Sequence, residues 1–166
     1  MVLASRGIPV SEKRLIENIE AEYKKSFKQV WNPTIAKLAC QNGIKVSFMA
    51  RWSLLKPANI KKAQDLDIAY RDMLEAVRLG CEVSYGKLTE TIMKENLLKG
   101  NYIQTSIHKN KLHTGAKSGY HSILLYDIVD NEVYFHDPDV GAALHCPLEV
   151  LMHAMNGAGV ALVYYN

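Results

Sequence analysis

The amino-acid sequence predicts an α+β fold in which N-terminal helices pack on a C-terminal antiparallel sheet. Apolar residues recur at helical spacing in the first half of the chain, whereas β-branched and aromatic residues dominate the second half. Helices first and strands later are typical of α+β domains rather than of alternating βαβ units. With 166 residues, 48% of them hydrophobic, the chain can bury one core, so we expect a single domain over 1–166.

Helix-capping signals divide the N-terminal half. Ser11 can cap one helix, and Asn32 before Pro33 pairs an N-cap residue with proline at the first helical position. Glycine ends such patterns, as Gly43 does here. The predicted elements are the end of a helix at 1–6 whose beginning is missing, helices over 11–25, 33–42 and 66–79, a strand over 44–50 and a loop over 51–64.

The C-terminal half reads as short strands interrupted by two helices. Gly100 and Gly157 end the helical patterns. A polar segment over 109–119 is expected to be a surface loop. The predicted strands cover 83–85, 102–108, 121–129, 133–136 and 160–165, and the predicted helices cover 87–98 and 147–156.

Composition excludes several classes of protein. The net charge of +3 comes from scattered lysines and arginines, so no basic stripe indicates nucleic-acid binding. Three cysteines without paired spacing argue against a disulfide framework and favour a reducing compartment. The first residues do not predict a signal peptide, and no apolar run approaches bilayer length. We expect a cytoplasmic protein with no membrane partner, no cofactor and no bound metal.

His121 and Asp137 are the strongest candidates for a functional site. They stand sixteen positions apart, at the start and at the end of two runs that read as one hairpin. A histidine base and an orienting carboxylate are arranged in this way in papain-like hydrolases. The two side chains share a sheet face only if the turn has an odd number of residues, such as 130–132, or if a strand carries a bulge.

A wider set of residues carries a resemblance to a known family. These are Gly7, Val10-Ser11-Glu12, Trp31-Asn32-Pro33-Thr34, His121 and Asp137-Pro138. Their order resembles that of the papain-like peptidase domains which cleave double-glycine leader peptides in bacteriocin exporters, and of their soluble relatives. The similarity spans nearly all of the chain and implies a papain-like fold, with His121 as general base and Asp137 as its orienting carboxylate.

The same resemblance implies that the family's glutamine and nucleophilic cysteine would fall before Met1. Our leading hypothesis is therefore a non-catalytic module that binds a peptide or protein segment, or regulates through such binding. The alternative is a truncated form of an active cysteine peptidase or amide hydrolase, with glutamine and cysteine upstream of Met1.

The cysteines within the chain are poor nucleophile candidates. A reactive thiolate needs a helix N-terminus or a nearby imidazolium to lower its pKa. Cys40 falls near the end of a predicted helix and Cys81 leads into a strand, so both are expected in the core. Cys146 is a remote candidate because it precedes Pro147, at the expected N-cap of the last helix.

The remaining histidines allow a third hypothesis, a metal-dependent hydrolase. His136, Asp137, Asp139 and His145 lie within ten residues and offer nitrogen and oxygen ligands. Their spacing matches no metal motif, and His136 alternates to the opposite strand face from Asp137. The other histidines are scattered and are expected on loops or helix surfaces: His108, His113 and His153.

Overall fold

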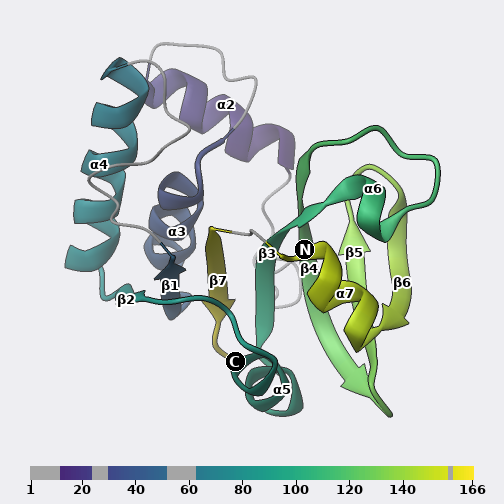
Figure 1. Ribbon diagram of the computed structural model, residues 1–166. Coiled ribbons are helices and arrows are strands. Elements are labelled where there is room, and N and C mark those ends of the chain that lie inside the picture. Colours follow the sequence, from purple (N-terminus) through teal and green to yellow (C-terminus); the bar gives the residue numbers. More distant parts are fainter. Residues whose placement is uncertain (1–11, 24–29, 52–62, 157–158) are drawn as a thin grey trace.

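The structure, a computed structural model, describes residues 12–23, 30–51, 63–156 and 159–166. Seven strands form one sheet. They are β1 (Val46–Ala50), β2 (Glu82–Tyr85), β3 (Tyr102–His108), β4 (Tyr120–Val129), β5 (Glu132–Asp137), β6 (Gly141–Pro147) and β7 (Val160–Tyr164). Their order across the sheet is β2-β1-β7-β3-β4-β5-β6 (Figure 1). The predicted α+β class is confirmed.

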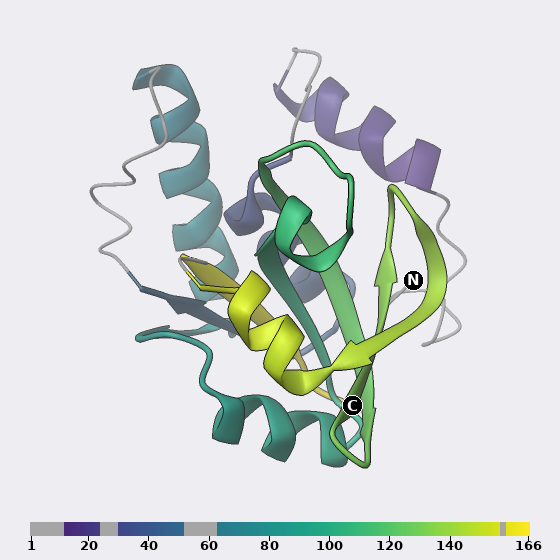
Figure 2. The ribbon, with the colours of Figure 1, turned by 45° about the vertical axis from the view of Figure 1, so that its right-hand side comes forward.

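The helices cover both faces of the sheet. They are α2 (Glu12–Tyr23), α3 (Asn32–Gln41), α4 (Ala63–Arg78), α5 (Glu90–Leu98), α6 (Lys109–Leu112) and α7 (Leu148–Ala154). In Figure 2, α6 and α7 lie in front of the strands and α3 lies behind them.

Strand alternation divides the core into two halves. In β7, Ala161 and Val163 belong to the core under α5 and α7, whereas Leu162 and Tyr164 belong to the core under α3 and α4. Successive side chains of a strand point to opposite faces, so one apolar strand serves both layers. His121 and Asp137 lie on the α5 and α7 face.

One strand pair departs from the predicted antiparallel sheet. β1 and β2 are parallel, whereas the other neighbouring pairs are antiparallel. The reason is the helix between them in the chain, because a helical crossover returns the chain in the same direction. The sheet is therefore mostly antiparallel, and its parallel pair lies at one edge.

Most predicted elements are present with shifted ends. α5 begins at Glu90 and not at 87, because the side chain of Thr89 caps it by accepting from the N–H of Ile92 at 3.3 Å. α3 begins at Asn32, one residue early, with Trp31 as N-cap. α4 begins at Ala63, inside the predicted loop. The helix end at 1–6, residues 24–25 and most of that loop lie outside the described residues.

Two elements were not predicted. β6 is an edge strand, exposed along much of its length, and it has no β-branched or aromatic residue, so its composition carries little strand signal. α6 is one short turn of helix in the segment that was expected to be a polar loop. Both elements lie beside the predicted site.

Candidate functional site: a histidine, carboxylate and histidine cluster

A β-bulge brings His121 and Asp137 to the same face. The hairpin turn has two residues, Asp130 and Asn131, with φ of 49° and 67°. With such a turn and regular pairing, His121 and Asp137 would point to opposite faces. The pairing shifts between Leu125 and Asp127, so Tyr126 is one extra residue in β4. Of the two alternatives drawn from the sequence, the bulge is the one that occurs.

Asp137 lies at the centre of the site and accepts three hydrogen bonds. Nε2 of His121 lies 2.7 Å from Oδ1, and Nε2 of His113 lies 2.8 Å from Oδ2. The backbone N–H of Asp139 donates to Oδ1 at 2.9 Å. Asp137 is 1% exposed, so these bonds replace nearly all of its hydration. The expected juxtaposition of His121 and Asp137 is present.

These contacts keep the carboxylate charged. Burial alone would raise the pKa of Asp137, but the N–H of Asp139 and the imidazoles of His113 and His121 outweigh it, and the pKa lies below its ordinary value. A carboxylate only accepts hydrogen bonds, so Nε2 of each histidine carries the proton. In neutral His121, Nδ1 then has its lone pair free to accept a proton.

A second acid lies on the Nδ1 side of His121. Oδ2 of Asp139 is 3.7 Å from Nδ1, and Nζ of Lys109 is 2.6 Å from the same oxygen. The hydrogen bond from Lys109 lowers the pKa of Asp139. A positive charge that forms on His121 is therefore flanked by two carboxylates. This arrangement suits a general base.

His113 is a site residue that sequence reasoning missed. It was expected on a loop surface, but it is half-buried after α6, and its ring lies 6.4 Å from that of Phe135. The backbone N–H of His113 donates to the backbone carbonyl of Lys109 at 2.9 Å, which sets the chain's path into the site. The available sequence signal was Leu112, an apolar residue in a polar segment, which packs on the core.

Cys146 lies too far away to act with His121. It was expected at a helix N-cap, but it is in β6, opposite Val133, and Pro147 holds the N-cap of α7. Val133 is four residues before Asp137, a distance of about 13 Å along a strand. Burial and the charge of Glu132 raise the pKa of Cys146 to about 11, so its thiol is protonated at neutral pH.

The other two cysteines lie on the opposite sheet face, as the core assignment predicted. Cys81 is buried in the core under α3 and α4, and half-buried Cys40 packs against that core. Burial raises the pKa of both thiols, that of Cys81 to about 12. Neither has the environment of a reactive thiolate.

The four candidate metal ligands do not converge. His136 stacks on Tyr126 with ring centroids 4.5 Å apart, and its Nδ1 accepts from the N–H of Ala143. His145 instead contacts Glu132, with Nδ1 3.1 Å from Oε2. The described residues contain no group of three ligand atoms drawn from the four candidates His136, Asp137, Asp139 and His145.

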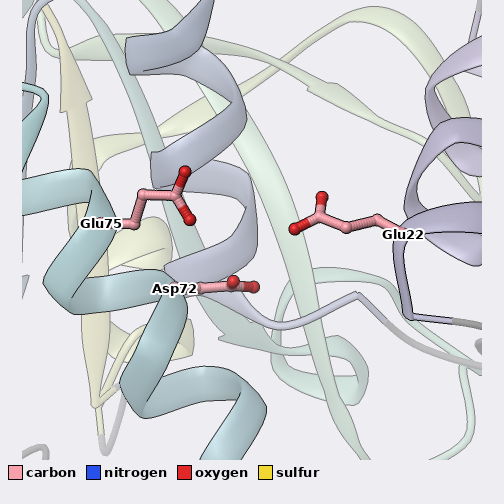
Figure 3. A group of neighbouring side chains, drawn as sticks. All are labelled: Glu22, Asp72 and Glu75. Carbon is pink, nitrogen blue, oxygen red and sulfur yellow. The ribbon is translucent and has the colours of Figure 1, made fainter.

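One group of three carboxylates lies close enough to share a cation. Glu22 approaches from α2, and Asp72 and Glu75 approach from α4 (Figure 3). Nζ of the fully buried Lys37 lies 2.7 Å from Glu22 and 3.1 Å from Asp72. Lys37 therefore supplies the positive charge that these carboxylates need, and the cluster ties three helices together.

No protein-family model matches the chain, and no curated protein matches it. Among the residues that the structure describes, no helix has the length and apolar character to cross a bilayer. Fold and geometry together define an α+β protein with a mostly antiparallel sheet, in which two imidazoles hold one buried carboxylate.

Proposed function

We propose that this chain is a relative of the papain-like cysteine peptidases that binds an extended peptide or protein segment without cleaving it. One observation carries the proposal. Nε2 of His121 is held 2.7 Å from Asp137 while Nδ1 is left as the basic atom, which is how a general base is oriented. The residue order that resembles the leader-peptidase family supports the same assignment.

The positions of the cysteines support binding rather than cleavage by this chain. A nucleophile must lie within hydrogen-bond reach of its base. Cys146 is about 13 Å along the strand direction from Asp137. Cys40 and Cys81 belong to the core on the opposite face of the sheet.

The surroundings of His121 suit an extended peptide. Tyr120 is 59% exposed and packs on His108 with ring centroids 4.3 Å apart, so it offers a fixed aromatic surface beside the site. β6 is the edge strand of the sheet on this side and is largely exposed. A peptide can add to such an edge through backbone hydrogen bonds, while pockets and rings select its side chains.

The test uses a fluorescent peptide that ends in Gly-Gly, the motif that the resemblance implies, and a proline-substituted version of it. Fluorescence polarisation measures binding, and mass spectrometry of the same mixture measures cleavage. We expect saturable binding of the first peptide, weaker binding by Tyr120→Ala, and no cleavage. Tyr85→Ala is the matched control, because Tyr85 is 68% exposed on β2 at the other edge of the sheet. Cleavage that disappears in His121→Ala would overturn the non-catalytic proposal.

The intact base favours a second candidate, an active cysteine peptidase or amide hydrolase whose thiol is supplied from upstream of Met1. The test is the in-frame coding sequence before Met1 and the activity of the longer chain it encodes. An upstream cysteine whose alkylation abolishes hydrolysis, together with loss of hydrolysis in His121→Ala, would establish this candidate. A longer chain with no upstream cysteine and no hydrolysis that depends on His121 would reject this second candidate.

A further inference from the structure

A cavity of about 370 Å³ is lined by residues other than those of the His121 site. It is bounded by the end of β1, the segment between β2 and α5, the middle of β3 and the end of α7. The volume is in the range of pockets that hold small molecules. Apolar side chains form much of its wall: Met49, Leu88, Met152, Met155 and Val160.

Thr105 supplies a polar group that the protein leaves unused. It lines this cavity, it is 2% exposed, and its Oγ1 has no hydrogen-bond partner among the described residues. Buried hydroxyl groups are nearly always hydrogen-bonded, because an unpaired hydroxyl loses its hydrogen bonds to water and gains none within the protein. The hydroxyl of Thr105 therefore points to a ligand group that donates or accepts a hydrogen bond.

The charges around the cavity favour an anion. Lys87 lines it, and the nine-residue helix α5 begins there with Thr89 as its N-cap. A helix N-terminus is the positive end of the helix dipole. The acidic residue of the wall, Glu90, is already paired with Lys94 at 2.8 Å.

We propose that this cavity binds a small monoanion which carries one apolar group and one amide carbonyl, the chemical class of the N-acyl amino acids. The carboxylate lies toward Lys87 and the start of α5, the carbonyl accepts from Thr105 Oγ1, and the apolar group packs on the methionines. Methionine side chains are flexible and polarisable, so this wall can adapt to different apolar groups. The assignment goes beyond the peptide site and does not depend on His121.

Three probes with the same apolar group separate the two polar contacts. N-acetyl-L-leucine carries all the groups, its amide derivative lacks the charge, and 4-methylpentanoate lacks the amide carbonyl. Isothermal titration calorimetry of the full chain should show saturable 1:1 binding, with N-acetyl-L-leucine the tightest of the three. Equal affinity for all three probes, or no saturable binding at millimolar concentration, would overturn the proposal.

Two variants assign the contacts to residues. Thr105→Val should weaken N-acetyl-L-leucine roughly threefold to tenfold, the range expected for one hydrogen bond, and leave 4-methylpentanoate unchanged. Lys87→Gln should weaken both acids roughly twofold to fivefold and spare the amide derivative. Lys99→Gln, at the opposite end of α5, is the matched control and should change none of the three.

Folding of the variants is checked by thermal unfolding without ligand. Thr105→Val removes an unpaired buried hydroxyl, so its unfolding midpoint should rise or stay the same. Unchanged affinity of folded Thr105→Val for N-acetyl-L-leucine would mean that Thr105 makes no hydrogen bond to the ligand, and would reject the site. If Thr105→Val fails to fold, the surface variant Lys87→Gln and the probe series decide the question.

Discussion

His121 contacts Asp137, with Nε2 2.7 Å from Oδ1, because Tyr126 adds one residue to the strand between the hairpin turn and His121. The two-residue turn and regular pairing would have placed the imidazole and the carboxylate on opposite faces of the sheet. The bulge reverses the face of every β4 residue before it. The whole candidate site therefore depends on one local irregularity of the backbone.

The charge of Asp137 should make the stability of the protein depend on acid pH. The folded-state pKa lies below the ordinary value of 3.8, so ionised Asp137 stabilises the fold above that pH. The contribution is lost as the pH falls from about 3.8 through the lower folded value. We expect Asp137→Asn to cost about 2 kcal/mol at pH 7 and less at pH 3.

Urea unfolding of both proteins between pH 2.5 and 7 measures this difference. Asp67→Asn is the control, because Asp67 is exposed on α4, and its curve should run parallel to that of the unmodified chain. A difference for Asp137→Asn that stays constant over the whole pH range would contradict the assignment.

His113 should stabilise the fold through Asp137. His113→Phe keeps an aromatic ring beside Phe135 but removes the donor to Oδ2, and we expect a loss of about 1.5 kcal/mol in the free energy of unfolding. His145→Phe, at an exposed histidine that contacts Glu132, should change it by less than about 0.5 kcal/mol. The measurement is urea unfolding at pH 7, and equal effects of the two variants would refute the role of His113.

Cys146 should behave as an unreactive thiol. Because its pKa is raised to about 11, alkylation by iodoacetamide at pH 8 should be roughly tenfold or more slower than that of free cysteine. The rate should rise with pH up to about 11 and be the same in His121→Ala. Peptide mapping after timed alkylation follows this residue alone. Fast alkylation that depends on His121 would instead make Cys146 its partner.

Lys37 should be essential for the packing of α2, α3 and α4. Burial disfavours its charge, but hydrogen bonds to Glu22, Tyr23 and Asp72 outweigh this and raise the pKa of the ammonium group. Lys37→Met leaves the buried carboxylate of Asp72 without a cation, with only the hydroxyl groups of Tyr23 and Thr34 as donors, so we expect a loss of about 3 kcal/mol in stability. Chemical unfolding monitored by circular dichroism measures it.

An exposed ion pair provides the control. Lys45, 63% exposed, pairs with Glu82 at 3.1 Å, and Lys45→Met should cost less than about 1 kcal/mol. The double variant Lys37→Met with Asp72→Leu should recover part of the loss, because it removes both buried charges. Similar losses for Lys37→Met and Lys45→Met would show that the buried ion pair contributes no more to stability than the exposed one.

Much of the fold could be predicted from local patterns. Alternating apolar residues mark β3 over 102–108, and Pro33 marks the start of α3, because period and capping are properties of neighbouring residues. The parallel pairing of β1 with β2 could not be read in this way, because it depends on how α4 crosses the sheet. The edge strand β6 is specified by its pairing with β5 rather than by its own composition.

The candidate site also contains features that the sequence predicts and features that only the tertiary structure determines. The residue types and their strand positions were enough to single out His121 and Asp137, since a histidine and a carboxylate on neighbouring strands are a recognisable chemical pair. Only the tertiary structure decided that Tyr126 bulges and that His113 binds the second oxygen of Asp137. It likewise decided that Lys37 neutralises Asp72. Each of these is a contact between distant segments, and its geometry is set by packing rather than by the local chain.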